Sequence, residues 1–228
     1  MTDTIAAIAT VVSNAGISII RVSGSDAVQI VNEIFVTKGG KHILNNVASH
    51  TIHYGFIQEQ DEMIDEVMVS VMKAPKSYTA EDVVEINCHG GVLVTNKILK
   101  TVLFHGARIA EPGEFTKRAF LNGRIDLTKA EAIMDLIEAK SDYALKASEN
   151  QLQGKIYDEV VKLRKKIIYE IAFIESAIDD PEHISLDGYT ERLMQVVDVV
   201  LIEIEELIKN AENGKLIKEG IDTVIVGK

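Results

Sequence analysis

Hydrophobic and polar residues alternate in short runs over the first half of the chain, and such runs predict strands. The runs are rich in β-branched residues, are separated by glycine or polar residues, and span 5–10, 16–22, 50–57, 66–72 and 83–88. Two stretches between them have helical spacing. We predict one helix over 25–35 with Ser25 as its N-cap, and another over 92–104 that ends at Gly106. Residues 1–117 are therefore predicted to form a mixed α/β domain.

From Pro112 onward the apolar residues follow the three- and four-residue steps of helices. A short helix is predicted over 114–122. Thr128 and Glu131 have the spacing of a capping box, with Thr128 at the N-cap of a second helix.

Two longer apolar stripes follow, over 152–178 and 193–211. Gly154 marks a break before the first stripe, and Pro181 ends it. Long amphipathic helices with so few breakers predict a helical bundle over 118–218, and further helices can complete such a bundle. The chain as a whole is predicted to be α+β, with a mixed α/β domain followed by a long-helix bundle.

The last residues change pattern once more. Gly220 precedes an apolar run over 221–226, which predicts a strand, and Gly227 and Lys228 follow it. A strand that leads into glycine is how a phosphate-binding P-loop begins. Taken alone this feature is common, and a simple tail is the preferred interpretation.

Charge and composition narrow the function classes. Lys and Arg number 24 against 35 Asp and Glu, so the formal net charge is −11. Strong binding to a nucleic-acid backbone usually needs a basic surface. The basic residues nearest to a cluster, Lys162, Arg164, Lys165 and Lys166, are interpreted as a solvated helix face. We therefore expect this chain to contribute little affinity for RNA.

The remaining composition favours the cytoplasm. Cys88 is the single cysteine and cannot form an internal disulfide. We find no apolar run of about 18 residues or more, as a membrane span requires. The first residues also lack the basic start and long apolar stretch of a signal peptide. We expect no association with membranes.

Four segments, in this order, resemble the MnmE (TrmE) family of tRNA modification GTPases. They are SIIRVSG at 18–24, SYTAEDVVEINCHGG at 77–91, EPGEFTKRAFLNGRIDLTKAEAIMDLI at 111–137 and TVIVGK at 223–228. The resemblance implies a folate-binding and dimerisation domain over 1–117, the first part of a helical domain over 118–218, and the first strand and P-loop start of a GTPase domain over 219–228. The first domain is similar to the folate-binding domain of glycine-cleavage aminomethyltransferases.

The resemblance also implies an activity for the whole protein. A homodimer would work with an FAD-dependent partner, MnmG (GidA), to modify carbon 5 of the wobble uridine of certain tRNAs. A tetrahydrofolate derivative, 5-formyl- or 5,10-methylene-tetrahydrofolate, would supply the one-carbon unit. GTP, magnesium and potassium would bind in the GTPase domain. We expect no measurable GTP binding by this chain, because it holds only the first P-loop residues, Gly227 and Lys228.

Three residues are candidates for the folate site by this resemblance: Arg21, Glu85 and Arg124. Strand alternation places Glu85, Asn87 and His89 on one face. A carboxylate such as Glu85 can accept hydrogen bonds from adjacent N–H groups of a pterin. From pattern alone, Glu85 would be a solvent-facing glutamate and Arg124 an exposed linker residue. Arg21 would be an edge-strand charge or part of a structural ion pair.

Other candidate chemistry is weak. His89-Gly90-Gly91 is interpreted as a chain turn, Cys88 as a small buried residue, and no spacing indicates a metal site or a catalytic residue. Two competing functions stay open: a folate-dependent aminomethyltransferase, and a non-enzymatic helical scaffold with an α/β cap. The long helices argue against the first, and the second predicts no folate binding.

Overall fold

The computed structural model describes residues 3–60, 62–219 and 224–227. The chain divides into two compact units, with the boundary between Asp126 and Leu127. The change of period at Pro112 favoured a boundary near residue 117 instead. The short helix α3 (Glu114–Leu121) lies in the first unit.

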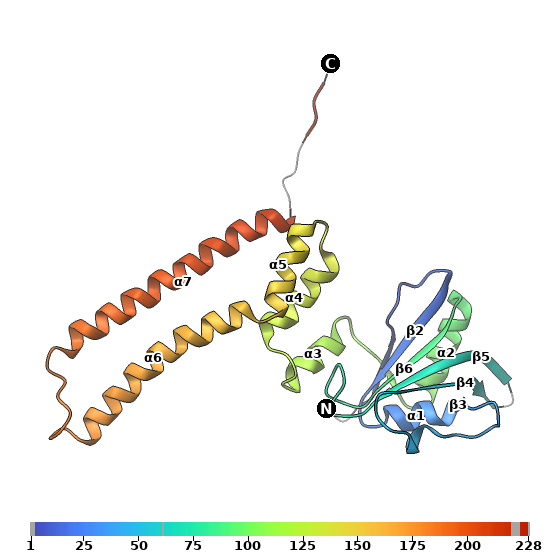
Figure 1. Ribbon diagram of the computed structural model, residues 1–228. Coiled ribbons are helices and arrows are strands. Elements are labelled where there is room, and N and C mark those ends of the chain that lie inside the picture. The colour runs from blue at the N-terminus through green and yellow to red at the C-terminus, as the bar shows by residue number, and fades with distance from the viewer. Residues whose placement is uncertain (1–2, 61, 220–223, 228) are drawn as a thin grey trace. The chain divides into compact units, whose positions relative to one another are not determined.

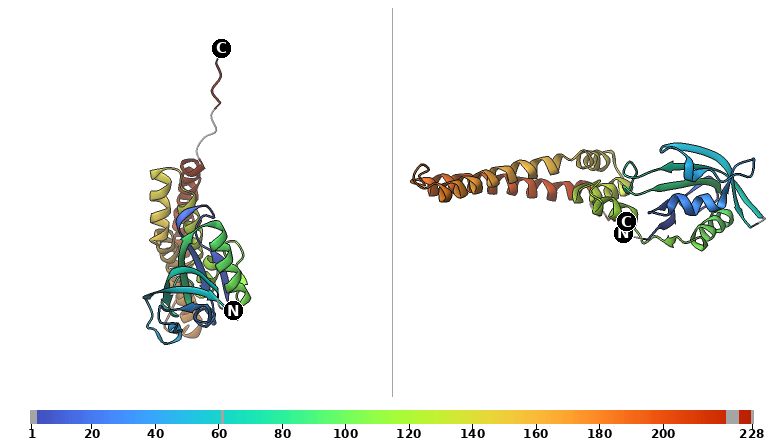
Figure 2. Two further views of the ribbon diagram at one scale, coloured as in Figure 1. Left: turned by 90° about the vertical axis from the view of Figure 1, so that its right-hand side faces the viewer. Right: turned by 90° about the horizontal axis from the view of Figure 1, so that it is seen from below.

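The first unit is built on a seven-stranded sheet in the order β3-β4-β5-β6-β2-β1-β7 (Figure 1). Its strands are β1 (Ile5–Ile8), β2 (Ala15–Ser23), β3 (Phe35–Val36), β4 (Thr51–Glu59), β5 (Glu62–Met72), β6 (Val83–Gly90) and β7 (Arg108–Ile109). β1 and β7 pair in parallel, and every other neighbouring pair is antiparallel. The helices α1 (Ala27–Ile34) and α2 (Val92–Phe104) lie on one face of this sheet (Figure 2).

The predicted mixed α/β organisation of this unit is confirmed. Each predicted strand and helix has an observed counterpart. The strands β3 and β7 were not predicted, because two residues are too few to show an alternating pattern. Gly106 follows α2 with φ +112°, as a helix-ending glycine should. The prediction of Ser25 as N-cap is wrong, because Asp26 holds that position without a side-chain cap. The Asp26 N–H instead donates to Thr4 Oγ1 at 3.1 Å.

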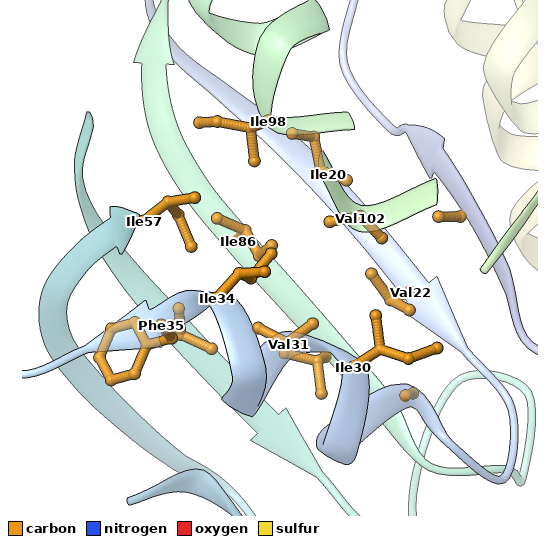
Figure 3. Packing of buried hydrophobic residues seen from close by; sticks show 14 of the residues in the cluster. Ile20, Val22, Ile30, Val31, Ile34, Phe35, Ile57, Ile86, Ile98 and Val102 are labelled. Atoms are coloured by element: carbon orange, nitrogen blue, oxygen red, sulfur yellow. The ribbon is translucent and has the colours of Figure 1, made fainter. Parts of the chain in front are cut away.

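The core lies between the sheet and its two helices (Figure 3). Ile20, Val22 and Ile86 point from the sheet toward the helices and are fully buried. Ile34 of α1 and Ile98 of α2 pack against them from the other side. Burial of these side chains holds β2 and β6 against the helices, which leaves the alternate residues of both strands on the opposite face.

The second unit is helical. It contains α4 (Leu127–Glu138), α5 (Asp142–Leu152), α6 (Lys155–Asp179) and α7 (Tyr189–Glu219). Gly154 takes φ +85° before α6, so the predicted break is confirmed. Thr128 is not an N-cap, because α4 already begins at Leu127. The separate helix α5 was missed; its N-cap is Ser141, whose side chain accepts from Ala144 N.

The long helices α6 and α7 lie side by side (Figures 1 and 2). Buried Glu170 of α6 accepts a hydrogen bond from the Tyr189 hydroxyl at 2.7 Å, and Lys166 pairs with Glu203 at 2.7 Å. Of the apolar stripe predicted over 152–178, only Leu163 is buried. The long-helix domain is present, and most of its predicted apolar stripe remains uncovered in the described part of the chain.

The strand predicted over 221–226 is absent from its described part, residues 224–226. Residues 221–223 lie outside the described residues, and 224–227 have no regular secondary structure. Val224, Ile225 and Val226 are each more than 80% exposed. A strand is stabilised by pairing with a neighbour, and no strand of the described chain pairs with this segment.

The packing of β4 against β3 generates a stability prediction. A Cβ added at Gly55 would meet the Val36 carbonyl oxygen and would lie 2.6 Å from the buried Phe35 ring. We expect Gly55→Ala to lower the free energy of unfolding by about 1–3 kcal/mol, as overpacking does. Urea unfolding followed by circular dichroism measures this. Gly16→Ala is the control, because a Cβ there meets nothing within 4 Å; equal losses in both variants would contradict the packing argument.

Candidate functional site

Arg21 and Glu85 face each other across the β2–β6 ladder. The Arg21 Nε donates to Glu85 Oε1 at 2.8 Å, and Nη2 lies 2.8 Å from the same oxygen. Because Ile20, Val22 and Ile86 point toward the helices, this pair lies on the opposite face of the sheet (Figure 3). The two side chains keep 26% and 22% of their surfaces exposed, so a ligand can reach them.

Arg124 joins this pair through an aromatic ring. The Arg21 guanidinium carbon lies 5.0 Å from the Tyr78 ring centroid, and that of Arg124 lies 5.1 Å from it. Phe115 of α3 provides a second ring 5.5 Å from the Arg21 guanidinium carbon. All three cation–ring distances are within the range of attractive cation–π contacts. The structure therefore brings Arg21 and Arg124 to the Tyr78 ring, and Glu85 joins them through its ion pair with Arg21.

Tyr78 and Phe115 were missed in the sequence. Neither belongs to a periodic apolar pattern: Tyr78 lies between β5 and β6, and Phe115 follows the first residue of α3. The only signal was their position inside the segments 77–91 and 111–137. Their role depends on contacts between segments far apart in sequence, and no local pattern reports such contacts.

The second oxygen of Glu85 is available to a ligand. Both Arg21 contacts go to Oε1, and no donor in the described part of the chain reaches Oε2. A carboxylate oxygen accepts hydrogen bonds, guanidinium groups donate them, and aromatic rings offer flat apolar surface. The arrangement therefore suits a planar ligand with N–H donors on one edge and an acceptor or anionic group elsewhere.

A cluster of charges surrounds the buried Arg118. The Arg118 guanidinium is fully buried and lies 2.9 Å from Asp3 Oδ1, 3.3 Å from Glu81 Oε1 and 3.1 Å from Glu114 Oε1. Arg108 also pairs with Glu114 at 2.7 Å. Hydrogen bonds from Arg108, and further ones from Glu111 N and Arg118, lower the pKa of Glu114 to about 2. The cluster ties β7 and α3 to the chain start and to the segment before β6.

The remaining candidates at the end of β6 are structural. His89 and Gly90 lie within β6 rather than in a turn, so the predicted turn at 89–91 is wrong at these two residues. The Asp65 carboxylate accepts from the His89 backbone N–H and pairs with Nδ1 at 2.7 Å, which raises the pKa of His89. Cys88 points inward and is 3% exposed, as expected, and burial raises the pKa of its thiol.

An apolar surface continues from this site across the outer face of the sheet. The register aligns Ile52, Ser70, Glu85 and Arg21 in one row across β4, β5, β6 and β2. The next row contains Tyr54 and Met68. Ile52, Tyr54 and Met68, together with Ile17 at the edge, are each 46–69% exposed. We call these four residues the outer apolar surface.

Comparison with known families covers both units. A family model described as the N-terminus of the GTP-binding protein TrmE matches residues 4–124, and a model described as the MnmE helical domain matches residues 127–223. The chain belongs to the MnmE (TrmE) family. The two matched ranges meet where the two compact units meet.

Curated relatives agree with this assignment, and each carries the name tRNA modification GTPase MnmE. The chain is 57% identical over 227 residues to the MnmE of Lachnoclostridium phytofermentans, covering 100% of this chain and 50% of that protein. It is 49% identical over 229 residues to that of Bacillus subtilis, and 52% identical over 228 residues to that of Lacticaseibacillus paracasei. Each of these covers 99% of this chain. The chain spans about half the length of these MnmE relatives, 50% and 48% in the latter two.

Two further properties can be judged only over the described residues. None of the described helices is both long and apolar enough to cross a membrane. Within the same ranges, no group of three or more His, Cys, Asp or Glu side chains is arranged to hold a metal ion. Of the two P-loop candidates, Gly227 is exposed in an irregular segment, and Lys228 lies outside the described residues.

The Glu114 contacts generate a prediction about pH. The folded-state pKa of about 2 lies below the ordinary value of 4.5. The stabilisation is therefore fully present above pH 4.5 and is lost as the pH falls toward 2. We expect a loss of at most about 3 kcal/mol from this group.

Urea unfolding of the wild type and of Glu114→Gln between pH 6 and pH 2.5 checks this expectation. The difference between the two should shrink as the pH falls, because glutamine has no charge to lose. Glu62→Gln is the matched control, since Glu62 forms an exposed ion pair with Lys97. A constant difference between Glu114→Gln and the wild type over this pH range would contradict the prediction.

Proposed function

We propose that this chain binds a reduced folate at Arg21, Glu85 and Arg124, as the folate-binding part of a GTPase that modifies tRNA. The observation that carries the proposal is that Arg21 and Arg124 both contact the Tyr78 ring, while Arg21 also pairs with Glu85. These residues come from β2, from β6 and from the connection after α3, and they gather beside one half-buried ring.

The chemistry of a pterin fits this arrangement. A pterin ring is flat and carries adjacent N–H donors, which match the open Oε2 of Glu85. The bond from Arg21 to Oε1 orients the Glu85 carboxylate before a ligand arrives, so less freedom is lost on binding. Arg124 then supplies a cation for a carbonyl or carboxylate group of the ligand.

We infer the activity of the whole protein from its relatives. They are named tRNA modification GTPases and are about twice as long as this chain. In the proposed reaction a folate one-carbon unit is added at carbon 5 of the wobble uridine, together with the FAD-dependent partner MnmG, in the cytoplasm. GTP, magnesium and potassium would bind to a GTPase domain beyond the matched region. The helical-domain match over 127–223 favours this function over an aminomethyltransferase.

We further propose that the chain forms a homodimer through the outer apolar surface. This surface lies beside the folate-site residues on the open face of the sheet. Exposed apolar clusters of this kind mark protein contacts in soluble proteins. A second copy of the chain would remove Ile17, Ile52, Tyr54 and Met68 from water.

The folate proposal predicts a graded loss of binding. Glu85→Gln should weaken 5-formyltetrahydrofolate by about tenfold to a hundredfold, because it replaces an acceptor of charge-assisted bonds with an amide. Arg21→Ala and Arg124→Ala should weaken it less, because we place these cations at a more exposed part of the ligand, where water screens their charge. Isothermal titration calorimetry on the chain and its variants measures each affinity.

Glu62→Gln is the matched control for the titrations, because it makes the same chemical change in an exposed ion pair on β5. It should bind as the wild type does. A correctly folded wild type that does not bind would remove the folate proposal. Unchanged affinity in Glu85→Gln would place the pterin on another residue.

The dimer proposal predicts a concentration-dependent mass. We expect the wild type to sediment as a dimer at tens of micromolar, and Met68→Glu to sediment as a monomer because a charge would be buried in the contact. Leu93→Glu is the control; Leu93 is 85% exposed on α2, on the other side of the sheet. A monomeric wild type, or a dimeric Met68→Glu variant, would contradict the proposal that this surface forms the dimer.

A further inference from the structure

We propose that Glu81 is a positioning residue for the folate site, and that it sets Tyr78 beside Arg21 and Arg124. The inference rests on the proposed function, because the site it serves is the folate site. It concerns residues 77–82, which we call the Tyr78 segment and which connect β5 to β6.

Glu81 links the Tyr78 segment to two other parts of the first unit. Its Oε2 accepts from the Ser23 hydroxyl at 2.8 Å, and both of its oxygens lie 3.3 Å from Arg118 Nη1. Ser23 follows Arg21 by two residues on β2, so it shares the face that carries Arg21. Glu81 thus connects the strand that carries Arg21 with the helix α3 that precedes Arg124.

Arg118, to which Glu81 binds, is a buried anchor. Its guanidinium is fully buried and is held by Asp3 and Glu114 as well as Glu81. Arg118 Nη1 also donates to the Asp3 backbone carbonyl at 2.9 Å. A buried guanidinium with several acceptors cannot move without leaving a charge unpaired, so its position is strongly determined.

The rest of the segment follows from this anchor. Thr79 is buried, its hydroxyl lies 2.7 Å from that of Ser23, and its carbonyl accepts from Asn122 Nδ2 at 2.7 Å. The Tyr78 hydroxyl lies 2.9 Å from Thr116 Oγ1. Ala80 takes φ +60°, a conformation that a side chain disfavours and that surrounding contacts must hold.

The half-buried Tyr78 side chain bonds to the Thr116 hydroxyl and makes two cation–ring contacts. Such contacts are weak when exposed to water. Thr79 and Glu81 bind the segment on either side of Ala80, and the Asp82 carbonyl also accepts from Gly24 N at 3.0 Å. Of these residues Glu81 carries the charge-assisted bond to Arg118. We expect its loss to loosen the segment, so that the ring lies beside the arginines for less of the time, while the two arginines stay on their own elements.

Glu81→Gln tests the proposal, with Asp3→Asn as the matched control. Both variants replace one carboxylate that contacts Arg118 by its amide, and only Glu81 lies in the Tyr78 segment. Titration with 5-formyltetrahydrofolate should show binding weakened by about tenfold in Glu81→Gln and nearly unchanged in Asp3→Asn. In the ligand-free chain, hydrogen exchange over 77–82 should be faster in Glu81→Gln alone.

Ser23→Ala supplies a second test, because it removes another partner of Glu81 without touching Arg118, together with the Ser23 contact to the Thr79 hydroxyl. It should weaken folate binding less than Glu81→Gln. The loss in the double variant should be smaller than the sum of the two single losses, since both changes act on one set of contacts.

Wild-type folate affinity in Glu81→Gln would overturn the inference. An equal loss of affinity in Asp3→Asn would also overturn it, because the charge cluster would then act on binding only by stabilising the unit. A folded wild type that binds no folate would remove the proposed function and, with it, any role of Glu81 in a folate site. Hydrogen exchange would then decide separately whether Glu81 holds the segment: unchanged exchange in Glu81→Gln would exclude that as well.

Discussion

The antiparallel register between β2 and β6 places Arg21 opposite Glu85 on the face of the sheet away from α1 and α2. The neighbouring residues Ile20, Val22 and Ile86 fill the core on the other face. A shift of the β2–β6 register by one residue would bury the charged pair and expose the apolar residues. The hydrophobic burial that stabilises the unit therefore also determines where Arg21 and Glu85 lie.

A second constraint is the pairing of buried charge. Arg118 and Arg108 carry two positive charges among the three carboxylates of Asp3, Glu81 and Glu114. Removing a charged group from water is costly unless partners surround it. These partners come from the chain start, from the Tyr78 segment and from α3. The cluster therefore holds together the chain start, the Tyr78 segment and α3, and the last two carry the candidate-site residues Tyr78 and Phe115.

Local patterns were sufficient for most helices and strands, and they failed at particular residues. The periods of two and of 3.6 residues predicted the strands and long helices because burial of one face requires them. Ser25 and Thr128 were wrong as N-caps, because several polar residues near a helix start can serve and packing selects among them. Helix α5 has few apolar residues, so its sequence DYALKASENQL showed no clear stripe.

By itself the sequence determined the α+β class, the change from a sheet domain to a helical domain, and the family through its long characteristic segments. It could also place Glu85 and Asn87 on one face of a strand, because alternation is a local property. Only the tertiary structure decided that Arg21 pairs with Glu85, that Arg124 joins them at Tyr78, and that Glu81 connects this ring to a buried arginine. Such contacts join residues up to 64 positions apart, as Arg21 and Glu85 are. Their formation depends on the packing of the whole unit, which no local pattern records.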